Sequence, residues 1–223
     1  LSPVAPLGLN VVLGDIDQNS TLAAARNLEV LADPTTVLAL ETARQPPAGD
    51  AVIRKCAAAR MLRLQPFDNP AFSRHFALFA LTSGGRARAE HGFELHALDD
   101  HLAAHLALFE RLAADGFRLA DLRVDVSDTA HDEVRLAAVE QQLFPSLHRR
   151  FPRATYALDR ARTHAMAYYR GLCFHIGARD PDGAPHQLSD GGSTDWLARL
   201  LSNGKQRFFV SGIGSELLLR RFQ

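Results

Sequence analysis

The amino-acid sequence predicts an α+β fold in which helices flank an antiparallel sheet. Strand-like runs follow one another through short turns, most clearly at residues 167–189, where two runs flank a polar turn at residues 178–183. Long helices are expected at residues 99–116, where apolar residues recur at spacings of three and four, and at residues 133–150, whose face is mixed. Strands joined by hairpins and short helices are typical of an antiparallel sheet with helices packed on it.

The N-terminal part is predicted to hold a short strand in a loop and then one helix. Residues 1–20 are rich in Pro, Gly and Asn and contain the apolar run LNVVL. Ser20 or Thr21 can cap a helix over residues 22–32, because a hydroxyl satisfies a free amide of the first turn. The segment QPPAGD at residues 45–50 breaks the chain.

Three strands are predicted in the next part of the chain. Residues 61–67 and 91–98 alternate apolar with polar side chains, and residues 77–81 form a short apolar run. Turn chemistry at residues 68–70 leads into a short helix, and TSGGR at residues 82–86 is a turn.

The clearest helix begins at a cap provided by Asp99 or Asp100 and ends at Gly116. A strand follows at residues 119–128. Pro145 is expected to break or kink the second helix, because proline lacks the amide that a helix interior needs.

The C-terminal quarter is predicted to hold a hairpin, a short helix and a last strand. The hairpin is followed by DGGSTDW, in which Ser193 or Thr194 can cap the helix that comes next. The last strand, at residues 207–216, ends in glycines. Residues 160–165, before the hairpin, are expected to be irregular.

Composition narrows the class of protein. The chain has 223 residues, of which 47% are hydrophobic and 22% are charged, as in ordinary globular proteins. Its formal net charge is zero, which argues against a dedicated nucleic-acid surface. No apolar run approaches the ~18 residues of a membrane span, and no signal-peptide pattern opens the sequence. Cys56 and Cys173 are expected to be buried free thiols in a reducing cytoplasm.

Two carboxylates could hold a ligand ammonium group. On a strand, Glu90, Gly92 and Glu94 share one face, and the glycine lets a ligand approach the backbone. The alternative is a solvated polar face.

Aromatic and glycine residues of the C-terminal quarter form two further candidates. Tyr169 shares a predicted strand face with Gly171, and a tyrosine beside a strand glycine often lines a pocket; the alternative is aromatic core packing. Gly191 and Gly192 could make room for a ligand, and the amides after them could attract an anion; the alternative is a structural turn.

Other motifs are weaker. His101 and His105 share a helix face and could bind zinc, but no third ligand is suitably spaced, so an exposed or hydrogen-bonded pair is the favoured interpretation. SGIGSE lacks the third glycine of a dinucleotide fingerprint. The sequence contains neither a P-loop nor a nucleophile elbow.

Taken in order, these segments resemble the catalytic core of class II histidyl-tRNA synthetases. HAMAYYRGLCFH is similar to that family's RGLDYYTGxxFE, GGSTDWL to its GGRYDxL, and SGIGSEL to its glycine-rich motif 3. Upstream, LQPFDNPAFSR is similar to LRPDxTPxxAR, and AEHGFELHALDDHLAAHLAL to the QxGVELIG strand and the helix after it. The resemblance covers about residues 61–217 and implies an antiparallel class II sheet flanked by helices.

Departures from the family pattern decide the expected activity. His164 and Leu217 stand where the family has arginines, and Ala167 stands where it has an aspartate. Ser193 and Thr194 replace an Arg-Tyr pair of the family. Phe67, with Asp68 next to it, matches the upstream acidic residue. Amino-acid activation needs positive charge at the phosphorus centre. The resemblance therefore implies a cleft without its arginines, no adenylate formation and no catalytic residues.

Within this superfamily the chain most resembles the regulatory subunit of short-form ATP phosphoribosyltransferase. That implies a single domain over residues 1–223 without an anticodon-binding domain, which binds histidine and no cofactor or metal, acts on the phosphoribosyltransferase catalytic subunit, and forms a homodimer or hetero-oligomer. The implied histidine site comprises Glu90, Glu94, Tyr168, Tyr169, Gly171, Gly191 and Gly192, and a nucleotide-site remnant comprises Arg86, Arg88, Gly212, Gly214 and Glu216. The alternatives are a ligase that activates an amino acid with ATP, and a structural paralogue that only dimerises.

Overall fold

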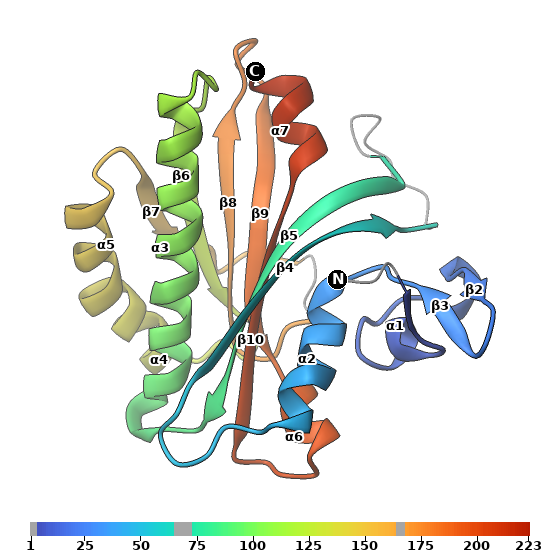
Figure 1. Cartoon of the computed structure of the whole chain (residues 1–223). Coiled ribbons are helices and arrows are strands. Elements are labelled where there is room, and N and C mark those ends of the chain that lie inside the picture. The colour runs from blue at the N-terminus through green and yellow to red at the C-terminus, as the bar shows by residue number, and fades with distance from the viewer. Residues whose placement is uncertain (1–3, 65–72, 164–167) are drawn as a thin grey trace.

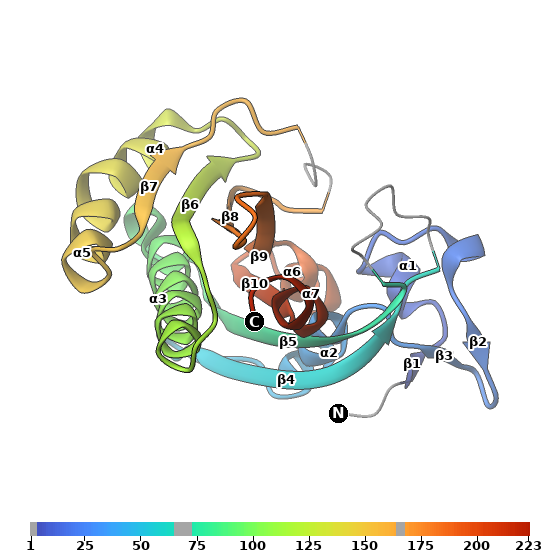
Figure 2. The same ribbon diagram turned by 90° about the horizontal axis from the view of Figure 1, so that it is seen from above.

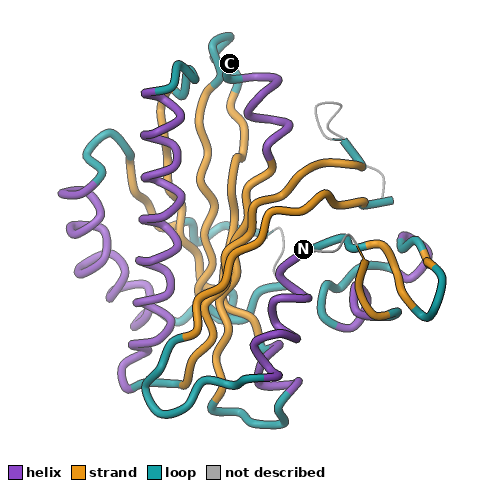
Figure 3. The backbone as a smooth tube through the Cα atoms, viewed as in Figure 1, coloured by secondary structure: helices purple, strands orange, loops and turns teal. Residues whose placement is uncertain are grey.

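The computed structural model describes residues 4–64, 73–163 and 168–223. Its centre is a seven-stranded sheet with the strand order β4-β5-β10-β9-β8-β6-β7, antiparallel except for the parallel pair β6 and β7 (Figure 1). A separate three-stranded sheet, β1-β3-β2, lies near the N-terminus. Helices lie around the central sheet (Figure 3), so the predicted α+β class is confirmed.

The strands are β1 (Val4–Pro6), β2 (Ala23–Ala24), β3 (Leu28–Val30), β4 (Ile53–Leu62), β5 (His75–Arg86), β6 (Ala120–Asp128), β7 (Thr155–Leu158), β8 (Leu172–Arg179), β9 (Pro185–Thr194) and β10 (Gln206–Gly214). The α-helices are α1 (Leu9–Val12), α2 (Pro34–Arg44), α3 (Gly92–Ala114), α4 (Glu133–Ala138), α5 (Phe144–Arg150), α6 (Trp196–Leu200) and α7 (Ser215–Arg221). Short 3-10 helices η1 (Gln18–Ser20) and η2 (Ala89–His91) and a π-helix η3 (Val139–Leu143) complete the described elements.

The helix expected at residues 22–32 is wrong, because this segment forms the β2–β3 hairpin. Arg26 and Asn27 both adopt positive φ in the turn, which ends any helix there. The buried Glu29 of β3 then accepts hydrogen bonds from the backbone amides of Gly8 and Asn10, at 2.9 and 2.6 Å. A carboxylate so bound ties the small sheet to the start of α1.

Helix α2 starts at a cap that the sequence analysis passed over. The Asp33 carboxylate accepts from the Thr35 amide at 2.9 Å, and Pro34 occupies the first helical position, where its missing amide is harmless.

The predicted turn at residues 82–86 is instead the end of strand β5. A Cβ on Gly84 would lie 2.7 Å from the Thr42 side chain of α2, and one on Gly85 would lie 2.5 Å from the Phe93 ring of α3. The two glycines thus let helices approach both faces of the sheet closely, which is their reason for being in a strand.

Helix α3 begins at Gly92, so the strand expected at residues 91–98 is wrong. Phe93 and Ala97 alternate with polar residues, but they also stand four apart and both are buried, as a helix requires. Glu90 and Glu94 therefore do not share a strand face. The helix ends close to Gly116, as predicted.

The strand at residues 119–128 is confirmed as β6, and residues 133–150 are helical as predicted. Pro145 does not break the helix. A π-turn over Val139–Leu143 lies just before it, where the Phe144 amide reaches back to the Val139 carbonyl. Because this turn is wider than an α-helical turn, the helix continues through the proline without a break.

The C-terminal hairpin is confirmed as β8 and β9, but β8 begins only at Leu172. Strand β9 continues through residues 190–194, which were expected to form a turn. The N-cap of α6 is Asp195, so Ser193 and Thr194 lie in the strand and cap nothing. Strand β10 and helix α7 follow, and β10 is the last strand expected from the sequence.

Helix α3 covers one face of the sheet, and α2 and α6 contact the other. Figure 2 shows that the sheet is curved and that the small N-terminal sheet lies far from α3. On the α3 side, His101 and His105 are buried. Their Nδ1 and Nε2 atoms lie 2.7 and 2.8 Å from the Ser211 hydroxyl, and His101 Nε2 lies 3.0 Å from the Ser83 hydroxyl.

Within the described residues no helix is long and apolar enough to cross a membrane. Cys173 is a buried free thiol as expected, whereas Cys56 is a free thiol on an exposed position of the edge strand β4.

Candidate functional site: a cavity on the sheet face opposite helix α3

A cavity of about 270 Å³ lies on the sheet face opposite α3. Its lining includes Gly212 and Gly214 of β10. We call it the sheet cavity. A second hollow of about 390 Å³, the N-terminal cavity, adjoins it and is lined in part by residues 14–17. Residues common to the two cavities are Asp33, Arg63, Tyr168, Tyr169 and Asp190.

Tyr168 joins the cavity to the start of α2. Its hydroxyl donates to Asp33 Oδ2 at 3.0 Å, and Arg63 Nη2 lies 3.7 Å from the same oxygen. Burial and the neighbouring Asp33 carboxylate raise the pKa of Tyr168 well above its ordinary value. The phenol therefore stays neutral near pH 7 and acts as a hydrogen-bond donor.

Tyr169 and Asp190 form the inner wall. Burial raises the pKa of the Asp190 carboxyl, although a hydrogen bond from Tyr169 and the charges of Arg162 and Arg63 oppose that rise. The Arg162 guanidinium lies over the Tyr169 ring, 5.6 Å from its centre. Asp190 lines both cavities, so a ligand cation placed beside its carboxylate would be stabilised.

A row of charged side chains runs from Asp190 across the same sheet face. Asp190 pairs with His175 of β8, which pairs in turn with Asp125 of β6. His175 Nε2 lies 3.2 Å from Asp125 Oδ2, and Arg123 donates two hydrogen bonds of 2.7 Å to the same carboxylate. Burial alone would raise the pKa of Asp125, but these partners outweigh it and lower the pKa to about 2.

At the other end of the cavity, the Glu216 carboxylate holds helix α7 against strand β5. Both of its carboxylate oxygens accept from the Ala77 amide at 2.8 Å, and Arg60 Nη2 lies 3.3 Å away. The carboxylate thereby ties α7 to β5 while its residue lines the cavity next to Leu217.

The structure brings together only part of the predicted site. Tyr168 and Tyr169 line both cavities, and the sheet cavity also contains the predicted Gly212, Gly214 and Glu216. Tyr168 and Tyr169 lie in the segment before β8 rather than on a strand.

The predicted glycines before and after β8 serve the packing behind the cavity. Gly171 adopts a φ of +102°, which favours glycine. A Cβ on Gly192 would lie 2.6 Å from the Tyr169 ring, and one on Gly191 would lie 2.5 Å from Ser211. Gly192 therefore lets the Tyr169 ring lie close to β9, and both glycines lie within strand β9 rather than in the structural turn given as the alternative.

Arg86, which was predicted to belong to the nucleotide-site remnant, lies away from the cavities. Arg86 pairs with Gln206, at the opposite end of β10 from Gly214. Eight residues separate these ends, or roughly 26 Å at about 3.3 Å per residue. Arg86 therefore does not support Gly212–Glu216.

Glu90, Glu94 and Arg88 also lie outside the residues that line either cavity. Glu94 accepts a 2.8 Å hydrogen bond from Arg207, and Arg88 donates to the Asp50 carbonyl at 2.6 Å. Glu90 is exposed in η2, with a φ of 53°.

Three charged residues that line both cavities were missed, namely Asp33, Arg63 and Asp190, and so was Arg162, whose guanidinium lies over the Tyr169 ring. The cap signal Asp33-Pro34 was available in the sequence, and Asp190 opens the DGG motif. Nothing in the sequence brings Arg63 to Tyr168. Arg63 lines both cavities, and Leu217, at the position of a family arginine in the resemblance, lines one of them. Phe67, Asp68, His164 and Ala167 lie outside the described residues.

Among residues 4–64, 73–163 and 168–223, no group of three His, Cys, Asp or Glu side chains is arranged to hold a metal ion. His101 and His105 share a helix face as expected, but that face is turned into the core rather than toward solvent.

The fold is that of the catalytic domain of class II aminoacyl-tRNA synthetases. Apo Staphylococcus aureus histidyl-tRNA synthetase is similar with a TM-score of 0.67 and 18% identity, over 98% of this chain and 58% of that one. A Bacillus halodurans protein described as an ATP phosphoribosyltransferase regulatory subunit/histidyl-tRNA synthetase has a TM-score of 0.62 and 12% identity, over 98% of this chain and 72% of that one.

A domain of Cryptosporidium parvum threonyl-tRNA synthetase, described as RNA-binding, is similar with a TM-score of 0.64 and 13% identity, over 98% of this chain and 57% of that one. This chain therefore spans less than two thirds of the length of the first structure. No protein-family model and no curated protein matches the sequence. At these identities the likeness establishes the fold alone.

Proposed function

We propose that this chain binds free histidine in the sheet cavity and acts in the cytoplasm as a regulatory subunit of ATP phosphoribosyltransferase. The observation that carries the proposal is the mixed charge of the cavity wall. Asp33 and Asp190 offer carboxylates, and Arg63 offers a guanidinium, within one cavity that also contains Tyr168 and Tyr169. A free amino acid carries both charges, so a wall with both is complementary to it.

The tyrosines add selectivity to this arrangement. Both phenols are neutral near pH 7, since burial raises each pKa well above the ordinary value. Neutral phenols and flat rings suit an imidazole, which stacks on an aromatic face and exchanges hydrogen bonds through either nitrogen. A cavity of about 270 Å³ is small, near the lower end of the usual range for small-molecule sites, which suits a single amino acid.

A regulatory role is favoured over catalysis by the chemistry at the end of β10. Glu216 is fully engaged with Ala77 and Arg60, and the next residue is the apolar Leu217. A phosphoryl or adenylyl transfer requires positively charged protein groups beside the negative phosphate, and the apolar side chain at position 217 does not supply one at the end of β10. The partner would be the phosphoribosyltransferase catalytic subunit, in a homo- or hetero-oligomer.

One observation favours a second candidate function, the activation of an amino acid with ATP. Arg63 lines both cavities, and Arg60, three residues earlier in the chain, pairs with Glu216 of the sheet cavity. Amino-acid-dependent exchange of pyrophosphate into ATP distinguishes the two functions. The regulatory function predicts no exchange with any amino acid, and measurable exchange would replace it with the ligase.

We expect histidine to bind with a Kd in the micromolar range, and Asp190→Asn to weaken this binding by about 10- to 100-fold. The substitution keeps the shape but removes the charge, and a charged hydrogen bond contributes roughly 1.5–3 kcal/mol. Calorimetry with histidine and with other amino acids checks both values. Asp121→Asn is the matched control, because Asp121 is exposed and lines neither cavity.

No heat with histidine up to millimolar concentration would contradict the proposed ligand, and unchanged affinity in Asp190→Asn would contradict the proposed site. Co-purification with a short-form catalytic subunit, and its inhibition by histidine only when this chain is present, tests the partner separately.

A further inference from the structure

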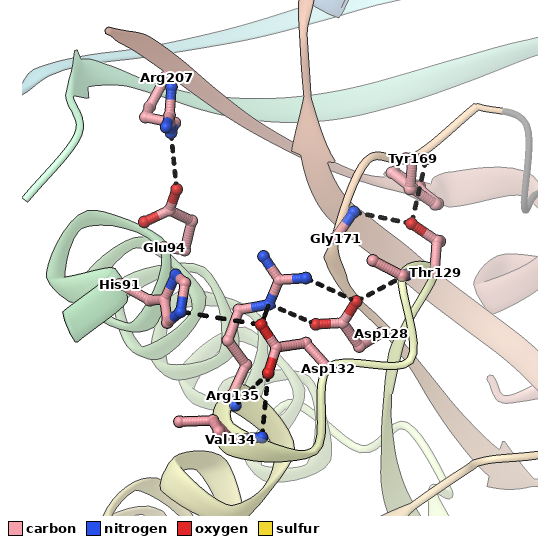
Figure 4. Close-up of polar contacts among 11 residues, drawn as sticks. His91, Glu94, Asp128, Thr129, Asp132, Val134, Arg135, Tyr169, Gly171 and Arg207 are labelled. Carbon is pink, nitrogen blue, oxygen red and sulfur yellow. Dashed lines mark hydrogen bonds and ion pairs between the residues drawn. The ribbon is translucent and has the colours of Figure 1, made fainter.

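The segment that carries the two cavity tyrosines is held by a hydroxyl from a neighbouring turn. Residues 168–171 form no helix or strand, so their backbone groups need partners outside regular structure. The Gly171 amide donates to Thr129 Oγ1 at 2.7 Å, and this hydroxyl donates in turn to the Tyr169 carbonyl at 3.4 Å. The Thr129 amide also donates to the Gly171 carbonyl at 3.0 Å. Figure 4 shows Thr129 lying between Tyr169 and Gly171.

The turn that carries Thr129 is itself fixed by a buried ion pair. Arg135 donates to Asp128 through Nε at 2.6 Å and through Nη2 at 3.0 Å, and the Asp128 side chain is completely buried. Asp128 also accepts from the Ala130 amide at 2.8 Å. A bidentate arginine–carboxylate pair restricts both side chains in position and angle, so the turn before α4 is held rigidly.

Arg135 contacts the tyrosine segment as well. Its Nη1 would lie 3.5 Å from a Cβ on Gly171, so the guanidinium lies beside that residue. In Figure 4, Arg135 lies between Asp128 and Asp132, and Asp132 in turn faces His91 at the start of α3. One arginine thus braces the turn and the tyrosine segment together.

We propose that Thr129, supported by the Asp128–Arg135 pair, is a positioning residue that sets the place of Tyr168 and Tyr169 in the cavity. Thr129 lines neither cavity, so it acts only through the segment it holds. Its hydroxyl accepts one hydrogen bond and donates another within the same segment, and no apolar side chain of its size can do either. The effect on histidine affinity rests on the proposed function, whereas the position of the tyrosines does not.

The single tryptophan of the chain makes this position measurable without any ligand. Trp196 packs edge-on against Tyr168, with ring centres 5.4 Å apart, and no other tryptophan contributes to emission. Thr129→Val removes the hydroxyl and keeps the shape, while Thr129→Ser keeps the hydroxyl. We expect Thr129→Val to change the Trp196 emission maximum and the near-ultraviolet circular dichroism and to weaken histidine binding about 10-fold. Thr129→Ser should keep the spectra and the affinity of the unsubstituted protein.

Thr155→Val is the control. The Thr155 hydroxyl donates to the Leu122 carbonyl of the neighbouring strand β6, and β7 lies at the edge of the sheet, away from the strands that line the cavity. A Trp196 signal in Thr129→Val identical to the unsubstituted protein would overturn the positioning role, whether or not histidine binds. A changed signal together with no histidine binding in the unsubstituted protein would keep the positioning role and reject the ligand. If Thr129→Val does not fold, Arg135→Lys gives the same test, since it keeps the charge but loses the bidentate contact. An unchanged Trp196 signal in that variant would also overturn the proposal.

Discussion

Lowering the pH from 7 to 4.5 is expected to remove several kcal/mol from the free energy of unfolding, because His101 and His105 are buried as neutral rings. Burial, together with the nearby charges of His105 and Arg54, lowers the pKa of His101 to about 3, and burial lowers that of His105 to about 4. Both values lie below the ordinary value of 6.5, so the unfolded chain binds more protons throughout this window.

The stability that the neutral rings provide is complete above pH 6.5 and is lost as the pH falls toward the folded values. Each histidine contributes a slope of up to ~1.4 kcal/mol per pH unit, so the pair can reach ~2.7 kcal/mol per unit. Urea unfolding at steps of pH measures this slope directly.

His105→Leu should reduce that slope by about half, since it removes one proton-binding ring. His105 is the better choice for substitution, because its Nδ1 has no hydrogen-bond partner within the described residues. His148→Leu, at an exposed position, should leave the slope unchanged. An unchanged slope in His105→Leu would show that acid lability comes from other groups.

Gly191→Ala is expected to destabilise the fold by about 3 kcal/mol or more, or to prevent folding. The added Cβ would lie 2.5 Å from Ser211 Cβ, 2.6 Å from the Val210 carbonyl oxygen and 2.7 Å from the Phe174 ring. The carbonyl belongs to the paired strand β10, which cannot move without breaking the ladder. Overpacking against flexible side chains costs about 1–3 kcal/mol, and a rigid backbone neighbour raises that cost.

Gly204→Ala is the matched control, because nothing lies within 4 Å of its added Cβ. It should change the free energy of unfolding by less than about 1 kcal/mol. Urea unfolding of both variants decides the point: a stable Gly191→Ala protein would contradict the close packing of β9 against β10 and the α3 face.

Local patterns identified most of the large sheet correctly. The strands predicted at residues 119–128, on either side of the polar turn at residues 178–183 and in the run before Gly214 are all present. These signals depend on neighbouring residues, so they survive without knowledge of the fold. The predictions failed where two structures fit one pattern, as at Phe93 and Ala97, which satisfy both a strand and a helix.

Glycines misled the sequence analysis for a related reason. Gly84, Gly85, Gly191 and Gly192 lie in strands, although glycine pairs usually indicate turns. Their purpose is the close approach of α2, α3, Tyr169 and Ser211, and these partners come from distant parts of the chain.

The sequence by itself determined the α+β class, the C-terminal hairpin and the two tyrosines that line the cavity. Only the tertiary structure decided which charges surround them, because Asp33, Arg63 and Asp190 lie far apart in the chain and meet through strand order and helix packing. Side-chain periodicity reports the burial of a segment, whereas a binding site depends on distances between segments. Those distances are set by the order in which strands pair, and no local pattern in this chain encodes that order.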